Sequence, residues 1–442
     1  MKIPKLSSDP NEDKARKAAA ALALLGLYGL GRSQFDPQAW AVSGGGSTFC
    51  KKLEMPGGSW FPPGSSPISQ CLINGGNNDI GADYGGISHA TYTSSTEYHW
   101  QHYMPSSGKL SKLHFRLVTA PGAGCWRQII IRKNGVDTGL VVRISDADTR
   151  GCDLVNEVDY VATDLISAKF SVYGAAAVTK GGWHLEAEDT LPERTIILGG
   201  GQFTIAGTRF DLLQGANANS MPVSVESEAD AIIPTPCTLK ELYVIQDRTS
   251  GGGYSYTVRK NAANTALALS ITGAAVAGSN LVDEVHFNAG DRCCMRVSPL
   301  PATQYPRSHW GLVLVPDIAG EAVIMGGLSV NMVAGTYFIA PPAPGYSSST
   351  HSWQLIGKKK LKKWFIRLSA PPGAGKSLVF SIYKNGVNTG FDVIISDLET
   401  TGSNTGDVID FDDYDRINMI VTAPAGPPAA LTAHWGLVQV KA

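Results

Sequence analysis

Hydrophobic and polar residues alternate in several short segments of the chain after residue 67. The segment Tyr254-Ser255-Tyr256-Thr257-Val258 is a clear example, and a period of two is typical of a strand with one buried face. Eight short strands are predicted in the middle of the chain, at 195–198, 221–227, 239–246, 254–260, 267–272, 282–287, 293–298 and 310–315. Strands this short and this numerous predict an antiparallel, all-β fold.

A hairpin motif recurs three times with a period of about 125 residues, far longer than the repeats of solenoids. The copies are Lys133-Asn134-Gly135, Lys260-Asn261-Ala262 and Lys384-Asn385-Gly386. Asn-Gly favours a two-residue turn in which both residues take positive φ, which leaves a different turn open for the copy with Ala262. Each copy ends in a tryptophan strand, and we expect its indole to be a core residue and not a platform for glycans; these residues are Trp183, Trp310 and Trp435.

The repeats divide the chain, because each tryptophan strand is followed by a glycine pair that marks the next opening strand. We expect sandwich domains at 68–192, 193–319 and 320–442, behind an N-terminal arm at 1–67. Eight antiparallel strands with long connections fit a jelly roll. An immunoglobulin-like sandwich is the alternative, and the lack of a regular Cys–Trp–Cys pattern disfavours it. The predicted class is three tandem antiparallel β-sandwich, jelly-roll-like domains after an N-terminal helix and extended arm.

The arm begins with a predicted helix at 9–31, in which Asp9 is the cap, Pro10 takes the first helical position and Glu12 completes a capping box. Its apolar part, 18–31, is shorter than the roughly 20 residues that span a bilayer. Acidic residues before that part, and no clear cleavage site after it, disfavour a signal peptide. Because an exposed apolar helix face needs a partner, we expect docking on another chain, with packing on the first domain as the alternative. The docking residues would be Leu22, Leu24, Leu25, Leu27 and Leu30. The Gly-, Ser- and Pro-rich stretch 32–67 is expected to be a linker.

Charge and cysteine content narrow the function. The net charge is −1, so no overall field attracts nucleic acid or an anionic membrane. The seven cysteines contain no CxxC pair, which disfavours a thiolate zinc site. Reduced, buried thiols are expected, with a disulfide between Cys125 and Cys152 as an alternative.

Three segments resemble ligand sites, and each also has a structural interpretation. Segment 372–377 ends in Gly-Lys-Ser like half of a phosphate-binding loop, but Ala370 stands where the first glycine belongs and a strand follows where a helix is needed. We expect a hairpin loop there. The acidic run 407–415 offers oxygen ligands for calcium, but a solvated strand face is expected. The basic run 358–364 could bind a polyanion, but lysines also protect an exposed strand edge, and an edge or solvated face is expected.

The histidines form no catalytic pattern. His99 and His102 flank Trp100 and could contribute to a metal site, although the sequence shows no acidic or cysteine partner. His309 and His434 recur beside the closing tryptophan and therefore follow the fold. The chain has no Ser-His-Asp order, paired-carboxylate motif or HExxH motif. We predict no catalytic residue, no metal and no cofactor.

The unit built from the Lys-Asn-Gly hairpin, a Gly-Asp turn and a closing tryptophan strand resembles repeats of bacteriophage structural proteins of the tail-fibre, receptor-binding and head-decoration types, over residues 68–442. The second copy departs from it at Ala262. The resemblance implies a non-catalytic protein on the outer surface of a virion, docked on other virion proteins through its arm. It also implies a homo-oligomer, with a trimer expected first and a host-surface glycan as a candidate ligand. The near-neutral charge argues against a specific nucleic-acid partner. It carries over no site residue. The alternative is a secreted or cell-surface carbohydrate-binding or adhesin protein. A retained Met1 favours the virion protein, and a cleaved, exported N-terminus favours the adhesin.

Overall fold

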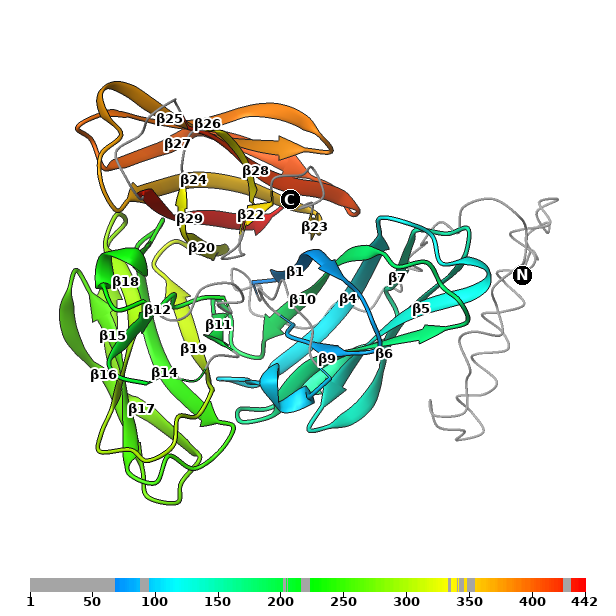
Figure 1. Ribbon diagram of the computed structural model, residues 1–442, viewed down its shortest axis with the longest axis horizontal. Coiled ribbons are helices and arrows are strands. Elements are labelled where there is room, and N and C mark those ends of the chain that lie inside the picture. The colour runs from blue at the N-terminus through cyan, green and yellow to red at the C-terminus, as the bar shows by residue number, and fades with distance from the viewer. Residues whose placement is uncertain are drawn as a thin grey trace, which may run out of the picture. The chain divides into compact units, whose positions relative to one another are not determined.

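Antiparallel strands make up nearly all of the computed structural model, which describes residues 68–87, 95–201, 204, 206–215, 223–332, 335–339, 341, 346–347, 354–423 and 431–442 (Figure 1). Within these ranges the helical elements are two 3-10 turns, η3 at Glu97–His99 and η4 at Glu226–Glu228. No helix in the described part of the chain is long and apolar enough to cross a bilayer. The predicted helix 9–31 and its five leucines lie outside the described residues.

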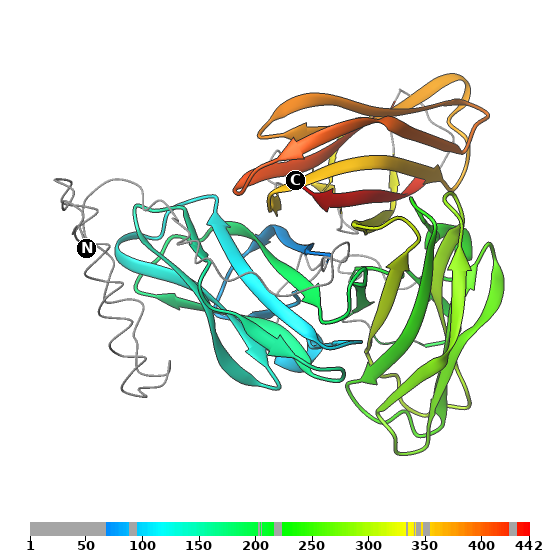
Figure 2. The ribbon, with the colours of Figure 1, turned by 180° about the vertical axis from the view of Figure 1, so that it is seen from behind.

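The strands form six sheets, which we describe as three sheet pairs (Figure 2). The first pair contains the order β1-β10-β4-β7, with β8 also on β4, and the order β2-β9-β5-β6, with β3 also on β9. Its strands are β1 (Gln70–Asp79), β2 (Tyr84–Gly85), β3 (His102–Tyr103), β4 (Gly108–Leu117), β5 (Gly122–Lys133), β6 (Val136–Asp146), β7 (Arg150–Asp153), β8 (Val158–Tyr160), β9 (Leu165–Tyr173) and β10 (Lys180–Asp189).

The second pair contains the orders β11-β19-β14-β17 and β12-β18-β15-β16, with β13 also on β18. Its strands are β11 (Thr195–Gly201), β12 (Arg209–Asp211), β13 (Ala231–Ile232), β14 (Cys237–Gln246), β15 (Gly253–Lys260), β16 (Ala263–Thr272), β17 (Ala277–Phe287), β18 (Arg292–Pro299) and β19 (Ser308–Pro316).

The third pair contains the orders β20-β29-β24-β27 and β22-β21-β28-β25-β26, with β23 also on β28. Its strands are β20 (Glu321–Met332), β21 (Gly335–Ile339), β22 (Tyr346–Ser347), β23 (Gln354–Ile356), β24 (Lys359–Leu368), β25 (Gly373–Lys384), β26 (Val387–Asp397), β27 (Thr401–Phe411), β28 (Asp415–Ala423) and β29 (Leu431–Lys441).

All three pairs share one connectivity. Without the short strands β3, β8, β13, β22 and β23, each pair has eight main strands, which we number in chain order. The first, eighth, third and sixth form one sheet, and the second, seventh, fourth and fifth form the other. The closing strand therefore lies between the opening strand and the third strand, as in β11-β19-β14. Two four-stranded antiparallel sheets joined in this Greek-key order constitute a jelly roll, which agrees with the predicted fold class and not with the immunoglobulin-like alternative.

Seven of the eight strands predicted in the second pair are present, and the one at 221–227 is wrong over its described part, 223–227. The second main strand is instead β12, Arg209–Asp211, while Glu226–Glu228 forms a 3-10 turn. Val223 does pair with Phe210 through two backbone hydrogen bonds, but only as an isolated bridge. Within this predicted strand, Val223 therefore contacts β12 but is not itself part of a strand.

Apolar side chains from the two sheets of each pair fill a core. Trp183, Trp310 and Trp435 are all buried there, which confirms the expectation that they are core residues. The indole of Trp310 donates a hydrogen bond to the Leu213 carbonyl at 2.8 Å. A Cβ atom at Gly199 would collide with this indole, and one at Gly326 with the indole of Trp435. In the second and third pairs, the glycine opposite the closing tryptophan therefore makes room for its ring, whereas Trp183 of the first pair lies opposite Asn74.

Candidate functional site

The Lys-Asn hairpin motif is a structural device that the fold repeats three times. In each copy the asparagine amide donates to an aspartate about 30 residues later, at 2.7 Å from Asn134 to Asp164, 2.7 Å from Asn261 to Asp291 and 2.6 Å from Asn385 to Asp415. The preceding lysine forms an ion pair with the same carboxylate. Burial alone raises the pKa of these aspartates, but the hydrogen bonds and the lysine outweigh it, so the pKa of each is lowered. The motif thus ties the hairpin to the start of the seventh main strand.

The hairpin with Ala262 uses the same turn as the other two. Asn261 and Ala262 have φ of 50° and 66°, close to the 52° and 77° of Asn134 and Gly135. Positive φ disfavours alanine but not glycine. The different turn left open by the sequence is therefore not used, and this hairpin carries a strained residue.

The three sheet pairs contact one another in a cyclic order. The short strand β3 of the first pair packs on β19 of the second, β13 of the second packs on β29 of the third, and β23 of the third packs on β10 of the first. A Cβ atom at Gly311 in β19 would collide with the Tyr103 carbonyl, and one at Gly436 in β29 with the Ile232 carbonyl. We call these three contacts the junctions. Two of them depend on a glycine that lets a neighbouring backbone approach.

The junction between the third and first pairs is built differently. His184 pairs with Ile73 of the opening strand. It occupies the position in the closing strand that Gly311 and Gly436 occupy in the other two pairs. The glycine is instead on the opposite side, where a Cβ atom at Gly357 would lie 3.2 Å from His184 Nε2. Here a ring of the first pair enters a space left by a glycine of the third.

Glutamine side chains bridge the junctions. Gln439 of the third pair accepts a hydrogen bond from the Cys71 N–H of the first at 3.0 Å, and donates to the Cys71 carbonyl at 3.3 Å. Gln70 makes the same two bonds with Ile196 of the second pair, both at 2.9 Å. Gln214 accepts from the Met325 N–H at 2.7 Å. A buried glutamine amide thus joins the opening strand of each pair to a neighbouring pair.

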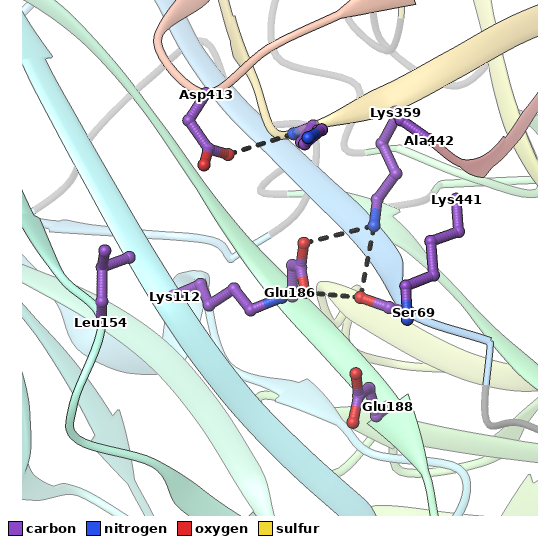
Figure 3. A pocket seen from close by; sticks show the side chains of 10 residues that line it. Ser69, Lys112, Leu154, Glu186, Glu188, Lys359, Asp413, Lys441 and Ala442 are labelled. Carbon is purple, nitrogen blue, oxygen red and sulfur yellow. Dashed lines mark hydrogen bonds and ion pairs between the residues drawn. The ribbon is translucent and has the colours of Figure 1, made fainter. Parts of the chain in front are cut away.

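A polar pocket of about 330 Å³ lies at the junction of the first and third pairs (Figure 3). Glu186 is at its centre and accepts a 2.5 Å hydrogen bond from Ser69. Its carboxylate also forms ion pairs with Lys112 at 2.5 Å and with Lys359 of the third pair at 3.2 Å. Burial alone raises the pKa of Glu186, but Lys359 and Lys112 bring it down to about 2. This glutamate is therefore an ionised structural anchor whose oxygens are already engaged.

A repeated bulge aims charged side chains at the junctions. Lys112, Glu241 and Lys363 occupy the third main strand of their pairs with φ of 50°, 55° and 51°, where the pairing register shifts. Glu241 pairs with Arg194, which also lies 3.4 Å from Asp189 of the first pair. Lys363 pairs with Glu321 at 2.7 Å. In the second pair the acidic residue is on the bulge, and in the third pair the basic residue is there.

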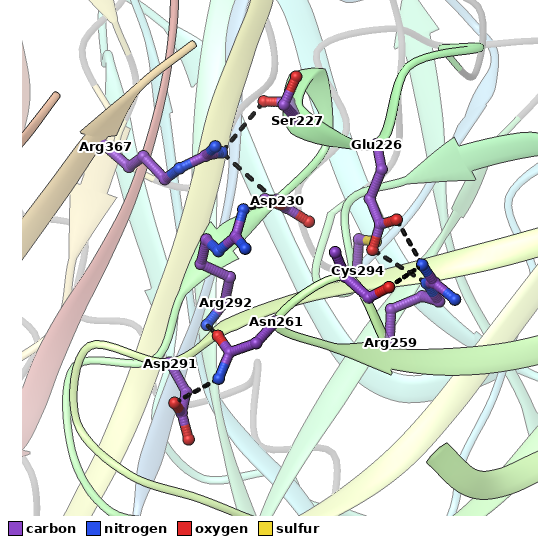
Figure 4. Close-up of polar contacts among 10 residues, drawn as sticks. Glu226, Ser227, Asp230, Arg259, Asn261, Asp291, Arg292, Cys294 and Arg367 are labelled. Atoms are coloured by element: carbon purple, nitrogen blue, oxygen red, sulfur yellow. Dashed lines mark hydrogen bonds and ion pairs between the residues drawn. The ribbon is translucent and has the colours of Figure 1, made fainter. Parts of the chain in front are cut away.

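The junction of the second and third pairs contains a second ionic cluster (Figure 4). Asp230 lies 3.0 Å from Arg292 and 3.4 Å from Arg367 of the third pair. Arg367 also donates to the Ser227 carbonyl at 3.2 Å. Glu226 pairs with Arg259, the arginine that clamps the Ala262 hairpin. Burial raises the pKa of Asp230, against the opposing effect of the two arginines.

The segments singled out in the sequence serve the fold. Gly373 begins β25, and the Gly375 N–H donates to Asp397 at 2.7 Å within the same hairpin, so 372–377 leads into a strand and not a helix. The acidic run covers the end of β27, the following turn and the first residue of β28. Asp410 pairs with Lys360, and Asp415 pairs with Lys384.

The edge interpretation of the basic run is wrong. Its strand β24 lies between β29 and β27 and is therefore central. Lys359 is buried in the junction, while Lys362 and Lys363 both pair with Glu321. A lysine run resembles an edge in sequence, but here its charges meet acids from other strands.

The structure also tests the expected disulfide and buried thiols, and it shows where His102 lies. Cys152 is disulfide-bonded whereas Cys125 is a free thiol, so the Cys125–Cys152 pair does not form. The free thiols of Cys71, Cys237, Cys293 and Cys294 are buried, as expected. His102 packs edge-on against His309 with ring centroids 5.1 Å apart, across the junction of the first and second pairs.

Two groups in the described ranges bring metal-binding atoms close together, and neither is a built metal site. The first consists of His114, His184 and Asp413. The two imidazoles are stacked with 14° between their planes, so their lone pairs lie in nearly parallel planes and do not converge on one ion. The second consists of Glu226, Asp230 and Cys294, whose carboxylates already pair with arginines.

The strand order and the three filled cores define the chain as an all-β protein of the jelly-roll class. No family model matches it, and no curated protein matches it. One similar solved structure is described as the triple jelly roll fold and turret assembly in an archaeal virus; it has 8% identity and a TM-score of 0.20, and covers 76% of this chain and 79% of that chain. A second, from Sulfolobus turreted icosahedral virus, has 9% identity and a TM-score of 0.17, and covers 76% of this chain and 80% of the other. Likenesses this low support no conclusion about function, so we base the fold class on the strand order.

Proposed function

We propose that the chain is a non-catalytic structural protein of a virus particle, in which three jelly-roll domains are locked into one block. The domains would be the three sheet pairs, with boundaries near residues 192 and 319. The cyclic junctions are the observation that carries this proposal, because each pair presses a short strand onto the closing strand of the next. Contacts of this kind favour a mechanical role.

The polar clusters support a structural role over a catalytic one. A general base needs a pKa near the working pH and a free oxygen that can reach a substrate. Glu186 has a pKa of about 2 and is bonded to Ser69, Lys112 and Lys359. A carboxylate held in this way stabilises a contact but accepts no proton near neutral pH.

The N-terminal arm would attach the block to the rest of the particle. Its five leucines, Leu22, Leu24, Leu25, Leu27 and Leu30, offer an apolar face for another virion protein or for sister copies, and the linker 32–67 offers reach. In this proposal the jelly rolls are displayed on the outer surface of the particle, as a fibre, decoration or attachment protein. A trimer remains the first oligomeric state to test.

The test compares the full chain with a chain lacking residues 1–40, in a particle-incorporation or co-sedimentation assay. A matched variant keeps the arm but replaces the five leucines with glutamine. We expect both variants to keep the β circular dichroism of the full chain and to lose incorporation. Normal incorporation of either variant would refute the anchor. Loss of β structure in the truncated chain would show instead that the arm belongs to the first domain.

A carbohydrate-binding role receives less support. The three closing tryptophans are buried and offer no platform. Trp126 is partly exposed, but Tyr173 is stacked on it with ring centroids 5.6 Å apart, and the Arg143 guanidinium lies 4.4 Å from its ring centroid. A sugar would have to displace one of these to stack on the indole. Binding of the intact chain to a glycan array would favour the alternative.

A further inference from the structure

The junction of the third and first pairs closes the cyclic order between parts of the chain that are far apart in sequence. Cys71 and Gln439, which meet there, are 368 residues apart. By contrast, β10 and β11, and β19 and β20, follow each other directly along the chain. Opening this junction would break only non-covalent contacts among the described residues. It is therefore the point at which the block can open while each sheet pair stays folded.

Two stacked histidines lie in this junction. The rings of His114 in β4 and His184 in β10 have centroids 4.4 Å apart, and both side chains are buried. Nδ1 of each ring has no hydrogen-bond partner. Tyr414 of the third pair closes over His114 edge-on at 4.7 Å, and Gly357 of the third pair faces His184. A proton added to Nδ1 of either ring would have no hydrogen-bond acceptor while the junction is closed.

We propose that protonation of His114 and His184 opens the junction between the third and first pairs, so that the block changes from a closed to an open form in mild acid. The inference concerns this junction alone and does not depend on the proposed role in a virion.

The charges around the histidines oppose one another. Asp413, on the turn after β27, and Glu186, on β10, favour a protonated His114, whereas Lys112, on β4, disfavours it. Lys359, on β24, and Lys112 both disfavour a protonated His184. Asp413 is exposed, so water screens its attraction, and Glu186 is already neutralised by two lysines. Arg150 packs over the outer ring, that of Tyr414.

Burial is the largest influence on both rings and sets the direction of the effect. It lowers the pKa of His114 to about 4, and the pKa of His184 well below 6.5. In the open form both rings would return toward about 6.5. The closed form is therefore favoured above pH 6.5 and loses its advantage as the pH falls toward 4. For His114 alone, the equilibrium between the closed and open forms shifts toward the open form by more than tenfold at pH 4.5.

The chain contains its own reporter of opening. Cys71 is a buried free thiol between the two pairs, and its sulfur accepts a hydrogen bond from the Gly357 N–H at 3.4 Å. Opening exposes this thiol. Cys237 and Cys293 are buried in the core of the second pair, where a thiol reagent reaches them only if that pair unfolds.

The experiment labels the full chain with dipyridyl disulfide, which stays reactive in acid, at pH 7.5 and pH 4.5, and identifies labelled cysteines by mass spectrometry. We expect Cys71 to label at least tenfold faster at pH 4.5, relative to a model thiol, with Cys237 and Cys293 still protected. Gln439→Ala, which removes two bonds across the junction, should speed the labelling of Cys71 at pH 7.5. That result would show that the thiol reports opening.

The variants His114→Phe and His184→Phe, alone and combined, separate the histidine pair from other acid effects. We expect the combined variant to keep Cys71 protected at pH 4.5. Acid labelling of Cys71 that persists in this variant would overturn the proposal, as would a wild-type Cys71 that remains protected. If a phenylalanine variant labels at pH 7.5, His114→Gln and His184→Gln replace it as non-titrating polar substitutes, and the same criteria apply. Equal labelling of Cys71, Cys237 and Cys293 would indicate general unfolding and also reject the proposal.

Discussion

Replacing Ala262 with glycine should stabilise the second hairpin. Ala262 has φ of 66°, a left-handed conformation that costs an L-residue roughly 1–2 kcal/mol. Glycine removes that cost, but it increases the freedom of the unfolded chain by about 0.4–1 kcal/mol. The expected net gain is about 0.7 kcal/mol, which corresponds to a roughly threefold smaller population of the open β15–β16 ladder.

The matched control is Gly135→Ala in the first hairpin. Gly135 has φ of 77°, and a Cβ atom there would meet nothing within 4 Å, so the substitution tests conformation without a steric clash. We expect it to destabilise the β5–β6 ladder by about the amount that Ala262→Gly stabilises its own. Hydrogen exchange of the ladder amides, followed by mass spectrometry, measures both. Faster exchange in Ala262→Gly, or unchanged exchange in Gly135→Ala, would refute the reasoning.

Three further predictions follow from the packing and charges. Trp310→Ala should lower the free energy of unfolding of the second pair by about 3–5 kcal/mol, because the indole is fully buried; an unchanged thermal midpoint would contradict this. Arg194→Glu should destabilise its junction by about 2 kcal/mol, and the added change Glu241→Lys should restore most of the loss; a double-mutant cycle in urea measures the coupling, and simple additivity would argue against the pair. Burial lowers the pKa of His102 to about 4, so the folded state should lose roughly 3 kcal/mol between pH 6.5 and pH 4, and His102→Phe should flatten this part of the stability curve; an unchanged curve would exclude the histidine as its cause.

Periodicity in the sequence was enough to predict the local structure. Alternation located seven of the eight main strands of the second pair, because one face of each strand is buried in a core. The recurring tryptophans were predicted as core residues on the same ground, and all three are buried. The repeated Lys-Asn pair identified the hairpins, although its role in binding a distant aspartate appears only when the seventh strand is in place.

The junctions could not be predicted, because a residue that faces a neighbouring sheet pair has the same local pattern as one that faces its own core. Lys359 belongs to a lysine run that favours an exposed edge, yet β24 is central and this lysine is buried against Glu186. His184 is distinguished only by comparison between the copies, since it stands where the other two have glycine. The one available clue was that difference between copies: positions that vary between repeats while their neighbours agree are those that meet different surroundings.

Joining three copies in one chain also frees their contacts from having to be identical. In a ring of three separate, identical subunits, one interface would be repeated by symmetry, and a partner could bind in any of three equivalent rotations. Here one junction contains a serine, a glutamate and two lysines, a second an arginine between two acids, and a third an aspartate between two arginines. Because the three junctions differ, a partner that contacts them can bind the three sheet pairs in one rotation only.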